Sequence, residues 1–305
     1  MVMIRPAAAI LVLALSMLLC RSAAGLPQPC RPPPLEILLT NDDGYRSPGI
    51  EALHEALQSA GHRVTRVAPA GNASGSSLSF SWKPLELIVD AKDPRIVGVA
   101  GGQPANAVVL AATTMYPART GPDLVVSGIN DGPNAGSLVA LSGTVGAAMA
   151  AVLMLDPPVP AFAVSAARIG VEGSPEQVEH ITEIADDFAG RLPKLLGWLC
   201  RTKDASRFDT VFNINYPARE ATAIAGIAVA GLDDLRSIRV SYETSPDTTL
   251  RTARVERVRP PKGISSSDVS LLDRGFVTVT PLKPRFAAPE SGLQELQHTL
   301  EDAGR

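Results

Sequence analysis

Two adjacent aspartates, Asp42 and Asp43, are the residues of this sequence best suited to chemistry. They lie in a short polar segment that ends in glycine, and two further polar, glycine-rich segments contain Ser74 and Asn130. Together these segments offer two carboxylates, a hydroxyl and an amide oxygen. Mg²⁺ and Mn²⁺ prefer oxygen ligands, and Mg²⁺ is usually held by one or two carboxylates together with water and phosphate oxygens. The residue types therefore predict one divalent cation, Mg²⁺ or Mn²⁺, bound by Asp42, Asp43, Ser74 and Asn130.

The histidines argue against zinc as that cation. The chain has four of them, at positions 54, 62, 180 and 298, and none lies in the three polar segments. Zinc sites usually contain histidine or cysteine ligands. A histidine-rich zinc site is therefore disfavoured.

A fourth segment, Ser142-Gly143-Thr144, predicts the position of a phosphate. It lies at the start of a predicted helix, and the free backbone N–H groups at a helix N-terminus attract anions. A divalent cation beside such a phosphate would polarise the phosphoryl oxygen and lower the pKa of a bound water. We expect Asp43 to bind the cation, and the general base stays open between Asp42 and Asp43.

Each of these segments also has an ordinary structural interpretation. An Asx-Gly segment after a strand is often only a turn, and the segment around Asn72 and Ser74 has a composition typical of loops. Ser142 would serve as a simple helix cap, because serine is preferred at that position. The functional interpretation depends on whether the fold brings the segments together.

The predicted fold does bring them together. Short apolar runs alternate with helical patterns, which is typical of βαβ units and a mainly parallel sheet. Ligands bind outside the carboxyl ends of such strands, near the point where the strand order reverses. In the common doubly wound order, the strands over 63–68 and 123–127 flank the strand over 35–40, and the three segments converge on one crevice. The sequence predicts strands over 35–40, 63–68, 85–89, 95–99, 123–127 and 161–165, and helices over 48–60, 104–115, 144–153 and 176–198, the last interrupted near Pro193.

Beyond Asn213 the pattern changes. Strands are predicted over 223–230, 238–242 and 276–280, with polar segments between them and no helix until Gly292. The predicted fold class is thus α/β, a doubly wound, mainly parallel sheet with a C-terminal antiparallel strand extension. We divide the chain into residues 1–25, a proline-rich leader over 26–34, one domain over 35–288 and a C-terminal helix or tail over 289–305.

The composition limits the ligands. The chain has 305 residues, of which 45% are hydrophobic, so a sizeable core is expected. Its formal charge of −3 comes from 28 basic and 31 acidic residues with no basic run, and only 4% of residues are aromatic. Long nucleic acids need basic surfaces and stacking platforms. Long DNA or RNA is therefore not expected as a ligand, and any nucleotide ligand is expected to be small.

Residues 1–25 are interpreted as a secretory signal peptide. Arg5 precedes an apolar stretch over 7–20, and small residues follow at 22–25. The apolar stretch is shorter than the roughly 20 residues that span a bilayer, so an uncleaved anchor is the weaker alternative. We expect export, to the periplasm or out of the cell, and no stable membrane insertion after cleavage.

Cleavage would also leave an even number of cysteines. It removes Cys20 and leaves Cys30 and Cys200. An even pair in an oxidising compartment can form a disulfide. Two free thiols, one of them buried in the apolar stretch that ends at Cys200, are the alternative, and the sequence leaves the choice open.

Four motifs occur in a recognisable order. They are residues 37–44 (ILLTNDDG), 67–75 (VAPAGNASG), 126–134 (VSGINDGPN) and 142–149 (SGTVGAAM), with later matches at 212–215 (FNIN) and 275–281 (GFVTVTP). In order and spacing they resemble the SurE family of survival-protein 5′/3′-nucleotidases. The resemblance extends from Leu35 to about Pro281.

This resemblance implies a Rossmann-like core, a divalent cation at the four oxygen ligands named above, and hydrolysis of nucleoside monophosphates to nucleoside and phosphate. It also implies a homodimer or homotetramer that uses the C-terminal strands. Ser142, Gly143 and Thr144 match the phosphate-side segment of the family, and Asn72 matches a polar residue lining its site. Asn41 is taken with them as a candidate substrate contact.

Two features depart from the family pattern. Residues 102–108 (GQPANAV) replace the usual Gly-Thr-Pro-x-Asp-Cys-Val, which leaves substrate preference and local packing open. The export signal is unusual beside the mostly cytoplasmic bacterial members.

Two other functions remain as alternatives. One is an acid-phosphatase-like enzyme of broad specificity, and the other is a nucleotide-binding protein without catalysis. The complete set of cation ligands argues against a pure binding protein. An NAD-dependent dehydrogenase is discounted, because no G-x-G-x-x-G turn follows the first predicted strand.

Overall fold

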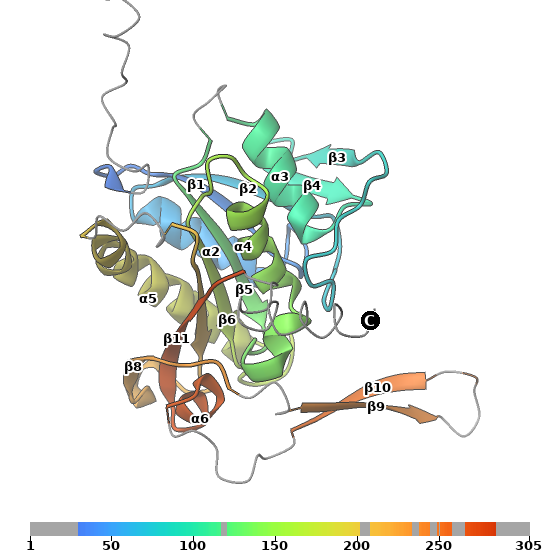
Figure 1. Cartoon of the computed structure of the whole chain (residues 1–305), viewed down its shortest axis with the longest axis vertical. Helices are drawn as coiled ribbons and strands as arrows, with labels where there is room; N and C mark the ends of the chain where they lie inside the picture. Colours follow the sequence, from blue (N-terminus) through green and yellow to red (C-terminus); the bar gives the residue numbers. More distant parts are fainter. Residues whose placement is uncertain are drawn as a thin grey trace, which may run out of the picture.

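A nine-stranded sheet forms the centre of the part of the chain that the structure describes (Figure 1). The computed structural model describes residues 30–116, 121–201, 208–233, 238–244, 249, 251–257 and 266–284. In spatial order the strands of the sheet are β3 (Glu86–Val89), β4 (Ile96–Ala100), β2 (Arg63–Pro69), β1 (Glu36–Thr40), β5 (Leu124–Asp131), β6 (Ala161–Ala166), β7 (Val211–Tyr216), β11 (Phe276–Leu282) and β8 (Gly226–Val229). The predicted signal peptide, residues 26–29 of the leader and the predicted helix after Gly292 lie outside the described residues.

Most of the sheet is parallel. The strands from β4 through β2, β1, β5 and β6 to β7 all run in the same direction. Outside this group, β3 pairs antiparallel with β4, β11 pairs antiparallel with β7, and β8 at the edge pairs parallel with β11. β1 lies between β2 and β5, which is the order that the prediction of one shared crevice required. The predicted α/β class is therefore confirmed.

Helices cover both faces of the sheet (Figure 1). One face carries α2 (Pro48–Ser59) and α5 (Pro175–Cys200), and the other carries α3 (Pro104–Thr114) and α4 (Gly143–Leu153). The buried side chains of β1 divide between the two layers, because Ile37 and Leu39 join the core under α2 and α5 whereas Leu38 joins the core under α3 and α4. Successive side chains of a strand point to opposite faces, so a strand covered on both faces is apolar along its length.

The predicted interruption of the last helix near Pro193 is wrong. α5 continues through Pro193 to Cys200. An interior proline costs about 3 kcal/mol. Leu192 and Leu196 on either side of it are buried, and burying a leucine side chain contributes about 1.5–3 kcal/mol. Packing against the sheet thus offsets the local cost.

Two further boundaries differ from the prediction. A short helix, α6 (Asp268–Asp273), precedes Gly292, and the Ser267 hydroxyl caps it by accepting a hydrogen bond from the Ser270 N–H at 3.2 Å. β5 does not end at position 127 but continues to Asp131, because its pairing with β6 resumes after a register shift between Ser127 and Asn130. Part of the third polar segment therefore lies on a strand and not in a loop.

The C-terminal extension contains a separate hairpin. β9 (Ile238–Thr244) and β10 (Arg251–Arg257) pair antiparallel in a two-stranded sheet of their own, which projects from the body of the protein (Figure 1). β10 was not predicted, because its sequence RTARVER is mostly charged and lacks an apolar stretch. β7 was also not predicted as a strand, although the later motif FNIN lies on it.

The open question of the cysteines has an answer in this structure. Cys30 and Cys200 form a disulfide with their Cα atoms 5.5 Å apart, which ties the chain before β1 to the end of α5. Among the described residues, no helix has both the length and the apolar character needed to cross a membrane.

Candidate active site

The loop after β1 is shaped by Asn41. The Gly44 N–H donates to Asn41 Oδ1 at 3.2 Å, and Asn41 Nδ2 donates to the Gly44 carbonyl at 3.1 Å and to Ser47 Oγ at 2.7 Å. Gly44 has a φ of +112°, a conformation that side chains with a Cβ rarely adopt. Asn41 is fully buried, so its side chain organises the turn that presents the two aspartates.

Asp42 points toward the N-terminus of α4. Its side chain is 2% exposed, and the Thr144 hydroxyl donates to Asp42 Oδ1 at 2.5 Å. Burial raises the pKa of Asp42 above its ordinary value, against the opposing effect of hydrogen bonds from Thr144 and Gly143. Gly143 contacts the carboxylate so closely that a Cβ there would lie 2.7 Å from Asp42 Oδ2.

Asp43 points into a cavity instead. The backbone N–H of Asp131 donates to Asp43 Oδ2 at 3.3 Å. Burial, and next the negative charge of Asp42, raise the pKa of Asp43 to about 7. The pKa values of both neighbouring carboxyl groups are raised, so their ionised forms are unfavourable without a counter-charge. A bound cation would supply that charge.

Backbone hydrogen bonds hold the second polar segment beside the first. The Ala73 N–H donates to the Asp42 carbonyl at 2.6 Å, and the Ser74 N–H donates to Asn72 Oδ1 at 2.8 Å. Ser74 and Asn72 line the same cavity as Asp43. The structure thus brings these predicted residues together.

Asn130, on β5, is the last of the predicted cation ligands. Its Nδ2 donates to the Gly132 carbonyl at 2.6 Å, and no described residue is bonded to its Oδ1. The next residue, Asp131, holds Asp43 through its N–H. Asn130 is therefore one residue from the backbone group that bonds to Asp43. It is not among the residues that line the cavity.

The cavity has a volume of about 510 Å³. Its apolar wall includes Pro48, Ile129 and Ile181, and its charged rim includes Arg46 and Arg168. The remaining lining residues are Asp43, Gly44, Ser47, Gly49, Ala70, Asn72, Ser74, Asp131, Glu172, Gly173 and Gln177. Such a mixture of apolar wall and polar groups is typical of small-molecule sites.

Sequence reasoning missed several residues of this cavity. Arg168 forms an ion pair with Asp131 at 2.5 Å, and Gln177 Oε1 accepts from the Gly173 N–H at 2.5 Å. Glu172 lies 3.8 Å from Arg168 on the same loop. The signal was present, because Arg168 lies two residues after the end of β6, at the same carboxyl edge of the sheet.

The predicted phosphate segment is organised around Asp42. Ser142 Oγ accepts from the Val145 N–H at 3.0 Å and so caps α4, while Thr144 is bonded to Asp42. Asn134 supports Thr144. Its Nδ2 donates to Thr144 Oγ1 at 3.4 Å and to Ser165 Oγ at 3.0 Å. This network also was not predicted.

The donor groups fit a hard divalent cation. They are carboxylate, hydroxyl and amide oxygens, which is the chemistry that Mg²⁺ and Mn²⁺ prefer. Ser76 Oγ, directly after the second polar segment, is buried and has no hydrogen-bond partner within the part of the chain that the structure describes, as expected where a ligand belongs. The described residues contain no cluster of three or more His, Cys, Asp or Glu side chains, so neutral oxygens would complete the coordination.

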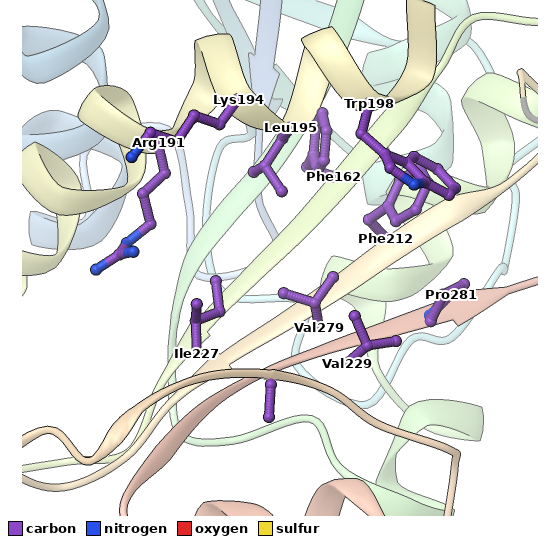
Figure 2. A pocket seen from close by; sticks show the side chains of 11 residues that line it. Phe162, Arg191, Lys194, Leu195, Trp198, Phe212, Ile227, Val229, Val279 and Pro281 are labelled. Atoms are coloured by element: carbon purple, nitrogen blue, oxygen red, sulfur yellow. The ribbon is translucent and has the colours of Figure 1, made fainter. Parts of the chain in front are cut away.

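A second cavity of about 370 Å³ has a different character (Figure 2). It lies between α5 and the strands β7, β8 and β11, with aromatic walls from Phe162, Trp198 and Phe212. Its only charged lining residues within the described chain are Arg191 and Lys194. Its described lining residues include no carboxylate, in contrast to the cavity at Asp43.

The fold and these residues define a doubly wound α/β protein whose carboxylates and hydroxyls gather at the carboxyl ends of its parallel strands. The family model of the survival protein SurE matches residues 37–239. The chain therefore belongs to the SurE family, which confirms the resemblance of its motifs.

Individual relatives match nearly end to end. The chain is 34% identical over 284 residues to a 5′-nucleotidase SurE from Desulfovibrio desulfuricans, covering 86% of this chain and 98% of that protein. It is 35% identical over 276 residues to a 5′-nucleotidase SurE from Synechococcus elongatus, covering 87% of this chain and 99% of that protein. The crystal structure of the SurE protein from Aquifex aeolicus superimposes with a TM-score of 0.68 at 32% identity, covering 87% of this chain and 99% of that one.

Proposed function

We propose that this protein is a divalent-metal-dependent phosphomonoesterase that hydrolyses nucleoside 5′- and 3′-monophosphates to nucleoside and phosphate. The observation that carries the proposal is the pair of adjacent carboxylates, with the buried Asp42 against the N-terminus of α4 and the half-buried Asp43 facing the cavity. The relatives named 5′-nucleotidase SurE support the same activity.

Each aspartate has a distinct task in this proposal. Asp43, with Asp42, Ser74 and Asn130, would hold the cation at the cavity wall, which Asp43 and Ser74 line. When bound, that cation would polarise the phosphoryl oxygen and lower the pKa of a water molecule. Asp42 is fixed by Thr144, so its carboxylate has one position relative to the N-terminus of α4.

The phosphate would lie at the N-terminus of α4. The helix dipole and the segment Ser142, Gly143 and Thr144 favour an anion there. Asn72 lines the cavity and is placed to contact the substrate. Asn41 contributes by shaping the aspartate turn, since its polar side-chain atoms are occupied within that turn.

The cavity also suits the rest of a mononucleotide. Its volume of about 510 Å³ is within the usual range for sites that take small molecules. Its apolar wall of Pro48, Ile129 and Ile181 offers a surface for a base, and its polar rim offers partners for a ribose. A long nucleic acid is not expected, because the chain has a formal charge of −3 and no basic run.

A matrix of metals against substrates tests the proposal. The mature protein is stripped of metal with a chelator, and phosphate release is then measured with Mg²⁺, Mn²⁺, Zn²⁺ or no metal, for 5′- and 3′-monophosphates and for p-nitrophenyl phosphate. We expect metal-dependent release that favours the nucleotides. Equal turnover of the aryl phosphate would support an acid-phosphatase-like enzyme instead, and nucleotide binding without release would support a binding protein.

We propose further that the protein is exported with cleavage after residues 22–25. The sequence of residues 1–25 supports this, and so does the disulfide between Cys30 and Cys200, because disulfides persist in oxidising compartments. Mass spectrometry of the protein secreted by, or recovered from the periplasm of, an expressing bacterium gives the first residue. A full-length chain in the cytoplasmic fraction would contradict export.

We also propose that the protein is a homodimer or homotetramer assembled through the hairpin of β9 and β10. An isolated two-stranded hairpin is at best marginally stable in water. This hairpin exposes 47% of Val240 and 70% of Tyr242, an apolar surface that a second copy would cover. Light scattering of the wild type and of a Val240→Asp/Tyr242→Asp variant tests this, and equal monomer masses for both would contradict it.

A further inference from the structure

An unused hydroxyl lies beside Asp42. The side-chain oxygen of Ser76 is buried and makes no hydrogen bond to any described residue. Such a group costs free energy, because its bonds to water are lost on folding and not replaced. Five other buried hydroxyls of the described residues also lack a partner: Thr40 on β1, Ser127 on β5, Thr278 and Thr280 on β11, and Tyr116 after α3. Ser76 differs from them because it lies in the loop directly after the second polar segment of the site.

Gly143 reveals the position of this hydroxyl. A Cβ built on Gly143 would fall 2.6 Å from Ser76 Oγ and 2.7 Å from Asp42 Oδ2. The two oxygens therefore approach the same side of the first residue of α4. This is the helix terminus at which an anion is favoured.

The loop that carries Ser76 is fixed in this position. The Ser77 N–H donates to the Leu141 carbonyl at 3.1 Å, and Ser77 Oγ donates to the Ala140 carbonyl at 2.8 Å. A Cβ on Gly146 would lie 1.9 Å from the Ser77 carbonyl oxygen, so the loop rests directly on α4. The Ser76 hydroxyl is therefore held against the start of α4 and does not move with a free loop.

Helix capping does not account for Ser76. The N-terminus of α4 is already capped by Ser142, which accepts from the Val145 N–H. The Ser76 backbone N–H donates to the Ala73 carbonyl at 3.1 Å, whereas the Ser76 hydroxyl has no partner among the described residues. A partner from outside the protein would satisfy it.

We propose that Ser76 is a phosphate-binding residue, and that its hydroxyl donates a hydrogen bond to a phosphoryl oxygen of the substrate beside Asp42. This inference rests on the proposed phosphomonoesterase function and adds a residue to its site. A donor fixed before the reaction stabilises the charge that grows on the phosphoryl oxygens in the transition state.

The test compares Ser76→Ala with Ser79→Ala. Ser79 is an exposed residue of the same loop and serves as the matched control. With a nucleoside monophosphate and Mn²⁺, we expect kcat/KM to fall about 10- to 100-fold in Ser76→Ala. Ser79→Ala should stay within about twofold of wild type, as surface substitutions away from a site usually do.

Two further measurements separate phosphate binding from a structural role. Inorganic phosphate should bind the Mn²⁺-loaded Ser76→Ala protein more weakly than wild type in a calorimetric titration. The urea midpoint of the metal-free variant should not fall, because the substitution removes a hydroxyl that bonds to none of the described residues.

Three results would overturn the inference: unchanged kcat/KM, unchanged phosphate affinity, or a loss of activity that comes with a lower urea midpoint. An inactive wild type would contradict the proposed function, and the phosphate titration would still decide the role of Ser76.

Discussion

Replacing Gly143 by alanine should damage the site without unfolding the protein. The added Cβ would lie 2.6 Å from Ser76 Oγ and 2.7 Å from both Cβ and Oδ2 of Asp42. These distances are too short for non-bonded atoms, so the carboxylate or the loop must move. Asp42 is buried and bonded to Thr144, which leaves it little room to turn away.

The size of the effect follows from this displacement. Misplacing a catalytic group by about 1 Å can reduce the rate about 100-fold. Crowding a packed site typically costs about 1–3 kcal/mol of stability. We therefore expect kcat/KM of Gly143→Ala to fall about 100-fold, with a cooperative unfolding transition shifted to lower urea.

Gly190 provides the matched control. It lies exposed on α5, and a Cβ built there has no atom within 4 Å. Gly190→Ala should keep wild-type kcat/KM and gain about 0.5–1 kcal/mol of stability, because glycine inside a helix is unfavourable. A Gly143→Ala enzyme with activity within twofold of wild type would refute the close contact at Asp42.

Three other changes have definite outcomes. Thr144→Val removes the hydrogen bond to Asp42 and should lower kcat/KM at least 10-fold, whereas Thr144→Ser should retain most activity; equal rates for both would contradict the role of the hydroxyl. Burial lowers the pKa of His54 to about 4, so this side chain takes up its proton in the unfolded chain near pH 6.5 but in the folded protein only near pH 4. Stability should therefore fall as the pH drops through this window, by up to about 3 kcal/mol, and urea titrations of His54→Leu should show a weaker pH dependence; an unchanged slope would contradict the shift. A Cys30→Ser/Cys200→Ser variant opens a loop with a sequence separation of 170 and should lose about 2–5 kcal/mol in urea unfolding without reductant; identical midpoints for variant and wild type would show that the cysteines do not pair.

The sequence was sufficient for the parts of the fold that depend on local pattern. The apolar runs of β1, β2 and β5 and the glycine-rich segments after them led to the correct strand order and to one shared crevice. These strands are covered on both faces, so their sequences are uninterrupted apolar runs that can be recognised. β10 has no such apolar run, because it pairs with β9 in the hairpin and does not pack on the core.

The directions of the site side chains could not be predicted in the same way. Asp42 and Asp43 were treated as one pair, but Asp42 bonds to Thr144 on α4 while Asp43 lines the cavity. That division depends on where α4 begins relative to β1, which is a long-range contact. The sequence predicts Asn41 as a substrate contact, but it gives no sign of the three hydrogen bonds by which Asn41 shapes the turn.

Replacing Asp43 by asparagine tests the central claim most directly, because it removes one negative charge at nearly constant size. Turnover of a nucleoside monophosphate and calorimetric binding of Mn²⁺ are measured for wild type and Asp43→Asn, with circular dichroism to confirm the fold. The proposed role of Asp43 predicts loss of nearly all turnover, weaker Mn²⁺ binding and an unchanged spectrum. Wild-type turnover in a folded Asp43→Asn protein would contradict it.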